Sequence, residues 1–152
     1  MRYHSPGGTF EQAGVTCSVV DNFQEARWRK LVWNVPFNGL TLATGGLTTD
    51  RLLADPHLAA EVRALMEEVA AGARAQNFDV PEALLQELLD LTPALGTYKP
   101  SSLLDWLEGR EVEVEAIWGE PLRRARAAGA STPRLALLYA LIRQQAAGAA
   151  RR

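Results

Sequence analysis

A row of polar side chains at steps of four residues is the first feature of this sequence that could do chemistry. Lys30, Asn34 and Asn38 stand in an otherwise apolar run from Trp28 to Leu42. Because an α-helix has 3.6 residues per turn, steps of four drift by only about 40° each, so the three side chains line up along one face. A lysine ammonium can donate a proton to a developing alkoxide, and two amides can orient both the lysine and a substrate.

The same row has a plainer explanation. Polar residues at every fourth position also form the solvent-facing edge of an ordinary helix, and asparagine amides often satisfy nearby backbone groups. Apolar residues cover most other sides of residues 28–42, which is typical of a buried central helix. Spacing alone leaves two interpretations open, a solvated edge and the wall of a wet cleft.

A second candidate segment begins at two serines. Ser101 and Ser102 fall in the first turn of a helix that Pro100 should start. Free N–H groups at such a position favour an anion, for example a carboxylate, although ordinary helix capping would explain the serines equally well.

Three glutamates follow, and one of them could face a cleft. Glu111, Glu113 and Glu115 alternate with two valines. We expect a helix from Glu111 to about Ala128, and acidic residues at its start would complement the helix dipole. A carboxylate that binds a substrate hydroxyl is the functional alternative, and composition does not choose among the three.

Composition limits the classes of function. The 152 residues, 47% of them hydrophobic, are enough for one globular domain with a core. A net charge of −2 with mixed signs argues against a nucleic-acid-binding surface. Cys17 is the only cysteine, and His4 and His57 lie far apart, so we expect no disulfide and no metal site. Neither a membrane span nor a signal peptide is evident, so we expect a cytoplasmic protein.

The elements that must position these residues are predicted to be helices with short links. Capping residues, prolines and glycines indicate where the helices begin and end. We expect helices at about 21–44, 56–75, 100–109, 111–128 and 132–146, and a further helix that begins at residue 81. Asp21 and Thr132 are the predicted caps of the first and last helices, and a short turn is expected at 48–53. We therefore predict an all-α, multi-helix, bundle-like domain over residues 21–152.

The lead-in, residues 1–20, holds the only good strand candidate. The stretch from Gly14 to Val20 alternates and is rich in valine and threonine. Because one strand cannot form a sheet, its partners are expected in a part of the protein that this chain does not contain.

The two candidate segments together resemble a known family. The run W-x-K-L-x-x-N-x-x-x-N-x-L-x-L from Trp28 is similar to the K-x-x-x-N-x-x-x-N helix in the C-terminal domain of ketopantoate reductase (2-dehydropantoate 2-reductase). The run S-S-L-L-D-x-x-x-G-R-x-x-E-V-E-A-I-x-G from Ser101 resembles the family's later segment, and Thr132-Pro133 also fits. Two motifs in the right order make this resemblance specific, and it covers roughly residues 13–146. It implies the all-α fold of 6-phosphogluconate-dehydrogenase C-terminal-like domains.

The resemblance implies a role for each matching residue. Lys30 matches the catalytic lysine, the general acid for the ketone oxygen as hydride arrives. Asn34 and Asn38 match the asparagines that bind substrate and orient the lysine. Ser101 matches the serine that holds the substrate carboxylate. Glu113 matches the catalytic glutamate that lies beside substrate and cofactor.

Other positions of the second motif are less informative. Asp105 matches a family aspartate to which we assign a structural role. Ser102, Val112 and Trp118 replace the family's Met, Thr and Asn. Because Trp118 removes an amide near the site, another 2-oxo acid is an alternative substrate.

Reductases of this family have two domains, and the resemblance implies that only one is present here. No G-x-G-x-x-G lies between a strand and a helix. Residues 21–152 would be the substrate-binding and dimerisation domain, and residues 1–20 a remnant of a missing Rossmann domain. NADPH would be the cofactor of the full-length enzyme, which reduces ketopantoate to pantoate in pantothenate biosynthesis. For this chain alone we expect no bound cofactor and no reductase activity.

Two alternatives remain open: a domain of an opine-type or other 2-oxo or hydroxy-acid dehydrogenase, or a stand-alone helical interaction module that has lost catalysis. We also expect a homodimer, because a missing domain would expose apolar surface and residues 14–20 could pair as an exposed edge.

Overall fold

The computed structural model describes residues 22–149, and this part of the chain consists of helices and short links. The elements are α2 (Phe23–Ala43), α3 (Thr49–Ala54), α4 (Pro56–Arg74), α5 (Glu82–Leu91), the 3-10 turn η1 (Thr92–Leu95), α6 (Ser101–Leu107), the π turn η2 (Glu115–Gly119), α7 (Glu120–Ala127) and α8 (Pro133–Ala149). The all-α prediction is confirmed for these residues. The strand predicted at 14–20 and the cap predicted at Asp21 lie outside them.

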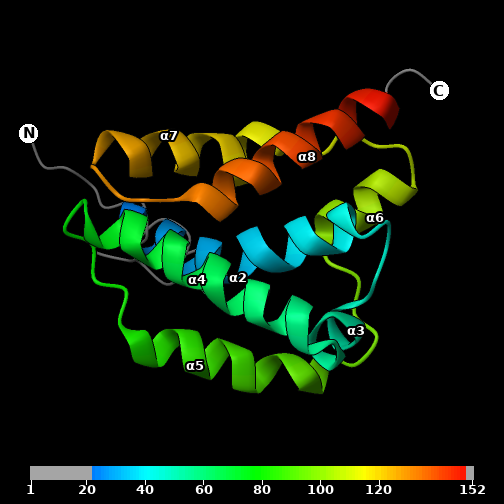
Figure 1. The fold of residues 1–152 in the computed structure, drawn as a ribbon, viewed down its shortest axis with the longest axis horizontal. Helices are drawn as coiled ribbons and strands as arrows, with labels where there is room; N and C mark the ends of the chain where they lie inside the picture. Colours follow the sequence, from blue (N-terminus) through cyan, green and yellow to red (C-terminus); the bar gives the residue numbers. More distant parts are fainter. Residues whose placement is uncertain (1–21, 150–152) are drawn as a thin grey trace, which may run out of the picture.

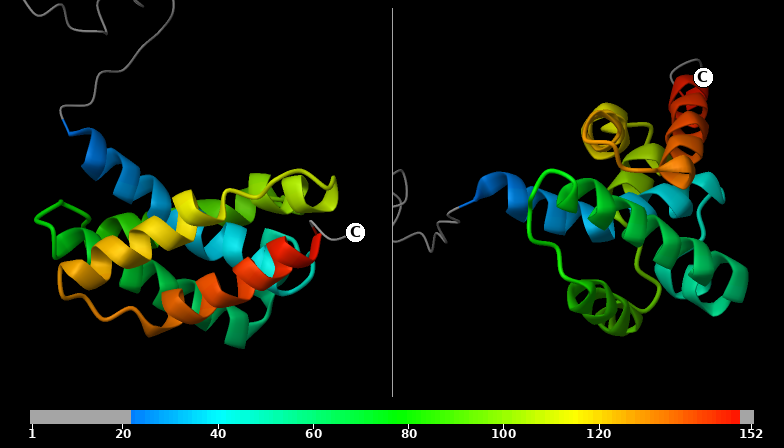
Figure 2. Two further views of the ribbon diagram at one scale, coloured as in Figure 1. Left: turned by 90° about the horizontal axis from the view of Figure 1, so that it is seen from above. Right: turned by 60° about the vertical axis from the view of Figure 1, so that its left-hand side comes forward.

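Helix α2 runs through the centre of the molecule. Figure 1 shows α2 and α4 in the middle, with α7 and α8 covering them from one side and α5 from the other. Figure 2 shows the same arrangement from two further directions, and α2 contacts α3, α4, α6, α8 and η2. Trp28, Val32, Val35 and Phe37 on α2 are almost completely buried. The apolar run therefore forms the central helix that its sequence predicts.

Local signals set most helix ends. The side chain of Asn22 accepts the N–H of Glu25 at 3.2 Å, so the first cap lies one residue after the predicted position. Asp55 accepts the N–H groups of His57 and Leu58 at 2.8 and 3.1 Å. These backbone donors have no partner within their own helices, which is why a capping side chain fixes where each helix begins.

Two glycines allow helices to approach closely. A Cβ atom built on Gly39 of α2 would lie 2.5 Å from a Leu138 methyl group of α8, and one on Gly72 of α4 would lie 2.8 Å from the Cβ of Ala125 in α7. Both distances are too short for real contacts. The glycines therefore let α8 and α7 pack directly on the central pair of helices.

The helix predicted from Glu111 begins later than expected. Residues 110–113 have no regular secondary structure, the helix starts at Val114, and its first turn is the π turn η2. Pro121 explains the irregular turn, because it has no N–H to donate and its ring would crowd the carbonyl four residues earlier in a regular helix. Two further predictions differ from the structure. The segment predicted as a turn at 48–53 contains helix α3, and the last helix extends beyond residue 146 to Ala149.

The cap of α8 comes from another helix. The buried carboxylate of Glu68, on α4, accepts the N–H groups of Arg134 and Leu135 at 3.0 and 2.9 Å. Thr132, the predicted cap, is buried, and its hydroxyl has no hydrogen-bond partner among the described residues. Thr132 does occupy the predicted cap position, because its carbonyl accepts the N–H of Ala136 at 3.0 Å and Pro133 begins the helix, but the capping side chain is that of Glu68.

Candidate functional site

The polar row on α2 runs from solvent into the core. Lys30 is exposed, Asn34 is half-buried, and Asn38 is only 2% exposed. All three lie within one unbroken helix, so their spacing places them along one face. A simple solvated edge would not bury its last member, and the burial of Asn38 requires a polar partner.

That partner is the start of α6. The N–H of Ser102 donates to Oδ1 of Asn38 at 2.9 Å, although the two residues are 64 positions apart. This N–H is one of the donors that a first helical turn leaves free. Asn38 therefore holds the serine segment against the polar row, and Ser101 stands next to this contact with an exposed side chain.

The segment Tyr98–Ser102, which we call the strap, contacts α2 at two points, Trp33 and Asn38. At one end the Tyr98 ring packs edge-on against Trp33, with 6.2 Å between ring centroids, and the Tyr98 carbonyl accepts the N–H of Thr49 at 3.1 Å. At the other end Ser102 is bound to Asn38. Because both ends are fixed, the position of Ser101 between them is fixed as well.

Glu113 lines a pocket away from the polar row. A pocket of about 680 Å³ is formed by residues 109–116 together with Trp106 and two alanines of α8, Ala146 and Ala149. The lining residues of this pocket do not include Lys30, Asn34, Asn38 or Ser101. The structure thus joins the asparagine row to the serines, while a joint site with Glu113 stays a prediction.

The three glutamates of this segment differ in their contacts. The Glu115 carboxylate accepts the Tyr139 hydroxyl at 2.5 Å and Nη1 of Arg123 at 2.8 Å. The hydrogen bond from Tyr139, followed by that from Arg123, lowers the pKa of Glu115. No ion pair involves Glu111 or Glu113 among residues 22–149. Glu115 is thus committed to structural contacts, which leaves the other two as candidates.

Two other positions of the second motif have structural contacts. Arg110 donates to Oδ1 of Asp105 from Nε at 3.0 Å and from Nη2 at 2.9 Å, as expected for a structural aspartate. Trp118 is completely buried, and its indole N–H donates to the carbonyl oxygen of Val35 at 3.1 Å. We expected position 118 to influence the substrate, but its ring belongs to the core between η2 and α2.

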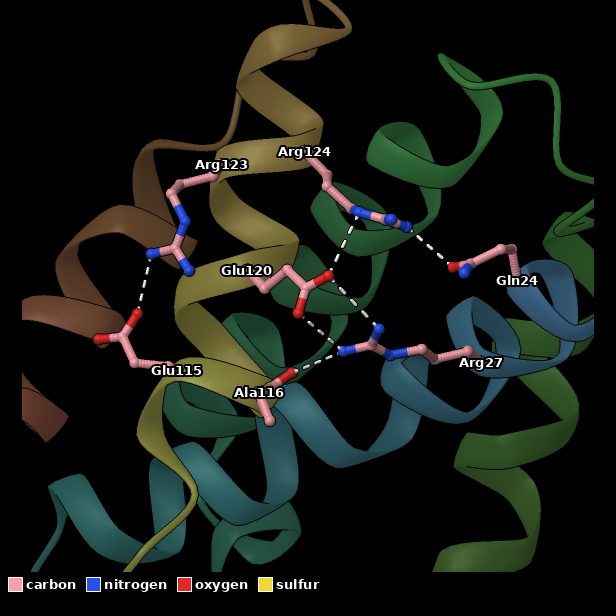
Figure 3. A network of polar contacts seen from close by, with 7 residues as sticks. All are labelled: Gln24, Arg27, Glu115, Ala116, Glu120, Arg123 and Arg124. Carbon is pink, nitrogen blue, oxygen red and sulfur yellow. Dashed lines mark hydrogen bonds and ion pairs between the residues drawn. The ribbon is translucent and has the colours of Figure 1, made fainter.

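Arg27 was missed by the sequence analysis. Figure 3 shows its guanidinium between the Glu120 carboxylate, at 3.3 Å, and the carbonyl oxygen of Ala116, at 3.4 Å. Arg124 contacts the same carboxylate from the other side and donates to Gln24 at 2.8 Å. The signal was available, because residue 27 precedes Lys30 by three and so belongs to the same helix face.

Cofactor and metal sites were also considered. Within residues 22–149, no three His, Cys, Asp or Glu side chains are grouped to hold a metal ion. No helix in this part of the chain is long and apolar enough to cross a membrane. The described residues also contain no strand followed by a glycine-rich turn and a helix, the arrangement that binds the pyrophosphate of a dinucleotide.

Comparison with known proteins gives the family. A family model described as "Ketopantoate reductase PanE/ApbA C terminal" matches residues 22–146. A 2-dehydropantoate 2-reductase of Nostoc sp. is 38% identical over 130 residues, which make up 86% of this chain and 40% of that protein. The crystal structure of 2-dehydropantoate 2-reductase from Methylococcus capsulatus is 34% identical with a TM-score of 0.85, and the match covers 94% of this chain and 49% of that one.

A more distant structure supports the fold alone. A dimeric ketopantoate reductase from Staphylococcus aureus has a TM-score of 0.85 at 24% identity, over 97% of this chain and 53% of that one. The chain thus spans about half, or less, of the length of the relatives that it matches. The resemblance seen in the two motifs is confirmed, and the chain belongs to the family of ketopantoate reductase C-terminal domains.

Proposed function

We propose that this chain is the substrate-binding half of an NADPH-dependent reductase that converts 2-dehydropantoate to pantoate. The hydrogen bond between Asn38 and Ser102 carries the proposal, because it brings the second motif segment onto the helix that also carries Lys30. The hydride donor must be held by a part of the protein outside the described residues. What this chain contributes is binding and orientation of the 2-oxo acid and the proton that completes the alcohol.

Lys30 suits the role of proton donor. Among residues 22–149 no hydrogen bond or ion pair engages its side chain, whereas the neighbouring Arg29 pairs with Glu25 and Asp79 at 3.5 and 3.1 Å. The sequence has 16 basic residues, of which only positions 30 and 99 are lysines. Since an arginine guanidinium does not give up its proton, the two lysines are the basic residues that can act as an acid, and Lys30 is the one that matches the family's catalytic lysine. We assign it protonation of the oxygen as the ketone is reduced.

The remaining roles follow from exposure and partners. The hydroxyl of Ser101, fixed by the strap, would donate to the substrate carboxylate. Asn34, half-buried beside Lys30 on the helix, would contact the substrate and orient the ammonium, while Asn38 positions the strap. Glu113, exposed in its pocket, would bind a substrate hydroxyl near the cofactor.

The test supplies the missing domain. A Rossmann domain from a ketopantoate reductase, joined ahead of residue 22, should give a fusion that oxidises NADPH when ketopantoate is added. Lys30→Met and Lys30→Arg should each lower kcat by about 10²–10⁴-fold, since neither side chain can donate a proton at neutral pH. Arg126→Ala is the matched control, because it removes an exposed charge from the end of α7. Full activity of Lys30→Arg would contradict the assigned role.

The isolated chain should show no turnover, and measurable ketopantoate reduction by the purified 152-residue chain would contradict this expectation. We also propose that the chain forms a homodimer. Leu137 and Leu141, four residues apart on α8, are 63% and 48% exposed and offer an apolar face for a second copy. Light scattering should give twice the monomer mass, and Leu137→Glu should reduce it to the monomer. A monomer at high concentration would contradict the dimer.

A further inference from the structure

We propose that Arg27 is a positioning residue, which fixes the π turn η2 against α2 and thereby sets the place of Glu113 relative to Lys30. The proposal rests on the roles that the proposed function gives to Lys30 and Glu113. It concerns the contacts of Arg27, in the first turns of α2, with Ala116 of η2 and with Glu120 at the start of α7, outside the strap and at the edge of the pocket that Ala116 helps to line.

The first observation is a carbonyl that the helix cannot satisfy. In the π turn, the N–H of Glu120 donates to the carbonyl of Glu115, five residues earlier. The next carbonyl, that of Ala116, would need the N–H of residue 121, and this residue is Pro121, which has none. Nη2 of Arg27 lies 3.4 Å from the Ala116 oxygen and supplies the missing donor from another helix.

The same guanidinium is held by charge. Its Nη1 and Nη2 atoms lie 3.5 and 3.3 Å from the two carboxylate oxygens of Glu120. This paired arrangement restricts the planar guanidinium to one orientation. Figure 3 shows that Arg124 contacts Oε1 of Glu120, which Arg27 also contacts, and that no contact joins Arg124 to Ala116. Arg27 is therefore the cation that joins the carboxylate and the orphan carbonyl.

A second contact joins α2 to η2, and the two contacts together fix the orientation of η2 relative to α2. The buried indole of Trp118 donates to the carbonyl of Val35. The first contact joins Arg27 to Ala116, and the second joins Val35 to Trp118. On α2 the two contacts therefore lie on either side of Lys30 in the sequence. With one contact the turn could pivot about it, whereas two contacts define its orientation as well as its distance.

Glu113 is coupled directly to this turn. Its carbonyl accepts the N–H of Ile117 at 3.2 Å, so it is the residue from which the helical segment starts. Any rotation of η2 relative to α2 would displace the Glu113 side chain with respect to Lys30. A misplacement of about 1 Å can cost an enzyme about 10²-fold in rate, so a modest pivot would be measurable.

A purely stabilising role makes a different prediction. The side chains of Arg27 and Glu120 are 30% and 39% exposed, and ion pairs with this much solvent contact add little to global stability. Removing Arg27 should therefore alter the local order of η2 and the turnover number more than the unfolding transition.

The experiment compares Arg27→Met with Arg124→Met, a matched control on the same carboxylate. In the 152-residue chain, hydrogen exchange of the backbone amides of residues 114–119 should be at least about fivefold faster in Arg27→Met and unchanged in Arg124→Met. In the active fusion, Arg27→Met should lower kcat by about tenfold or more with KM changed less than about threefold. Arg124→Met should stay within about twofold of wild type in both constants.

Pro121→Ala gives an independent check, because it restores an N–H at position 121. In that background the Ala116 carbonyl has a partner within its own helix, so Arg27→Met should accelerate exchange less than it does in wild type. An equal acceleration in both backgrounds would show that the carbonyl contact is not what Arg27 contributes, and would overturn the proposal.

The outcomes separate this proposal from the function on which it rests. Unchanged exchange at residues 114–119 in Arg27→Met overturns it, and so does accelerated exchange with wild-type kcat in the fusion. Faster exchange with lower kcat supports it. A wild-type fusion without any activity on ketopantoate contradicts the proposed function, while the exchange data still decide whether Arg27 fixes the turn.

Discussion

Glu68 should be among the most consequential side chains for stability, because its buried carboxylate on α4 caps another helix. Its carboxylate is 8% exposed and accepts two backbone N–H groups at the start of α8, at 3.0 and 2.9 Å. A hydrogen bond to a charged group contributes about 1.5–3 kcal/mol, and two bonds to one carboxylate are not fully additive. Glu68→Ala should therefore lower the free energy of unfolding by about 2–4 kcal/mol, a large part of the 5–15 kcal/mol typical of a domain.

Two companion variants sharpen this prediction. Glu68→Gln keeps one oxygen but turns an NH2 group toward the second donor, so its cost should be smaller, about 1–2 kcal/mol. Glu61→Ala is the matched control on the same helix, because it removes an exposed carboxylate that pairs with Arg134 at 2.9 Å. An exposed pair contributes at most about 1 kcal/mol.

A substitution at Thr132 tests whether α8 is capped by Glu68, as observed, or by the Thr132 hydroxyl, as the sequence suggests. If the hydroxyl of Thr132 capped α8, Thr132→Val would cost about 0.5–2 kcal/mol. Because that hydroxyl is buried without a partner among the described residues, the isosteric change should be neutral or stabilising. Urea unfolding followed by far-UV circular dichroism measures all four variants. A Glu68→Ala variant as stable as Glu61→Ala would refute the reasoning.

Three further predictions concern the site and its surroundings. Asn38→Ala leaves a buried N–H at the start of α6 unpaired, so urea unfolding should show a loss of about 1–3 kcal/mol, and KM of the active fusion should rise. Tyr139→Phe should raise the pKa of Glu115 toward its ordinary value of 4.5, as measured by NMR titration. Because the folded-state pKa is lowered, this contribution to stability exists above that ordinary value and is lost as the pH falls through the folded pKa, so the stability difference between the two proteins should shrink in acid. Gly119→Ala would push a Cβ atom into the Glu115 carboxylate and to 3.0 Å from the Tyr139 ring, at a cost of about 1–3 kcal/mol in thermal or urea unfolding, whereas Gly148→Ala, with open space around it, should be neutral or slightly stabilising.

The parts of the fold that could be predicted are those set by neighbours in sequence. Asp55-Pro56 begins α4, Pro100 precedes α6, and Gly109 and Gly129 end helices with φ angles of +71° and +86°. Such signals act within one turn, because they satisfy or block backbone groups at that place. The period of the polar row was equally local, so its alignment on α2 could be foreseen.

What could not be predicted depends on contacts between distant residues. The burial of Asn38 follows from its bond to Ser102, and the cap of α8 comes from Glu68, 66 and 67 positions before the amides it accepts. Periodicity assigns faces to a helix but does not say which other element will lie on them. The burial of Trp118 could not be predicted for the same reason, since its indole pairs with the carbonyl of Val35, 83 positions away.

The π turn also changes how this segment would tolerate insertions and deletions. A ring closed over five residues contains one residue more than the ring of an α-helix, so residues 115–119 carry an extra position within an otherwise helical segment. Deleting one residue there would return the ladder to the α register. Because the π ring and the α ring each close roughly one turn of the axis, the segment before it, including Glu113, would keep nearly the same direction relative to α7. The turn at residues 115–119 can thus lose one residue without reorienting the acidic segment, whereas the same deletion within regular α7 would rotate everything before it by about 100° relative to the rest of that helix.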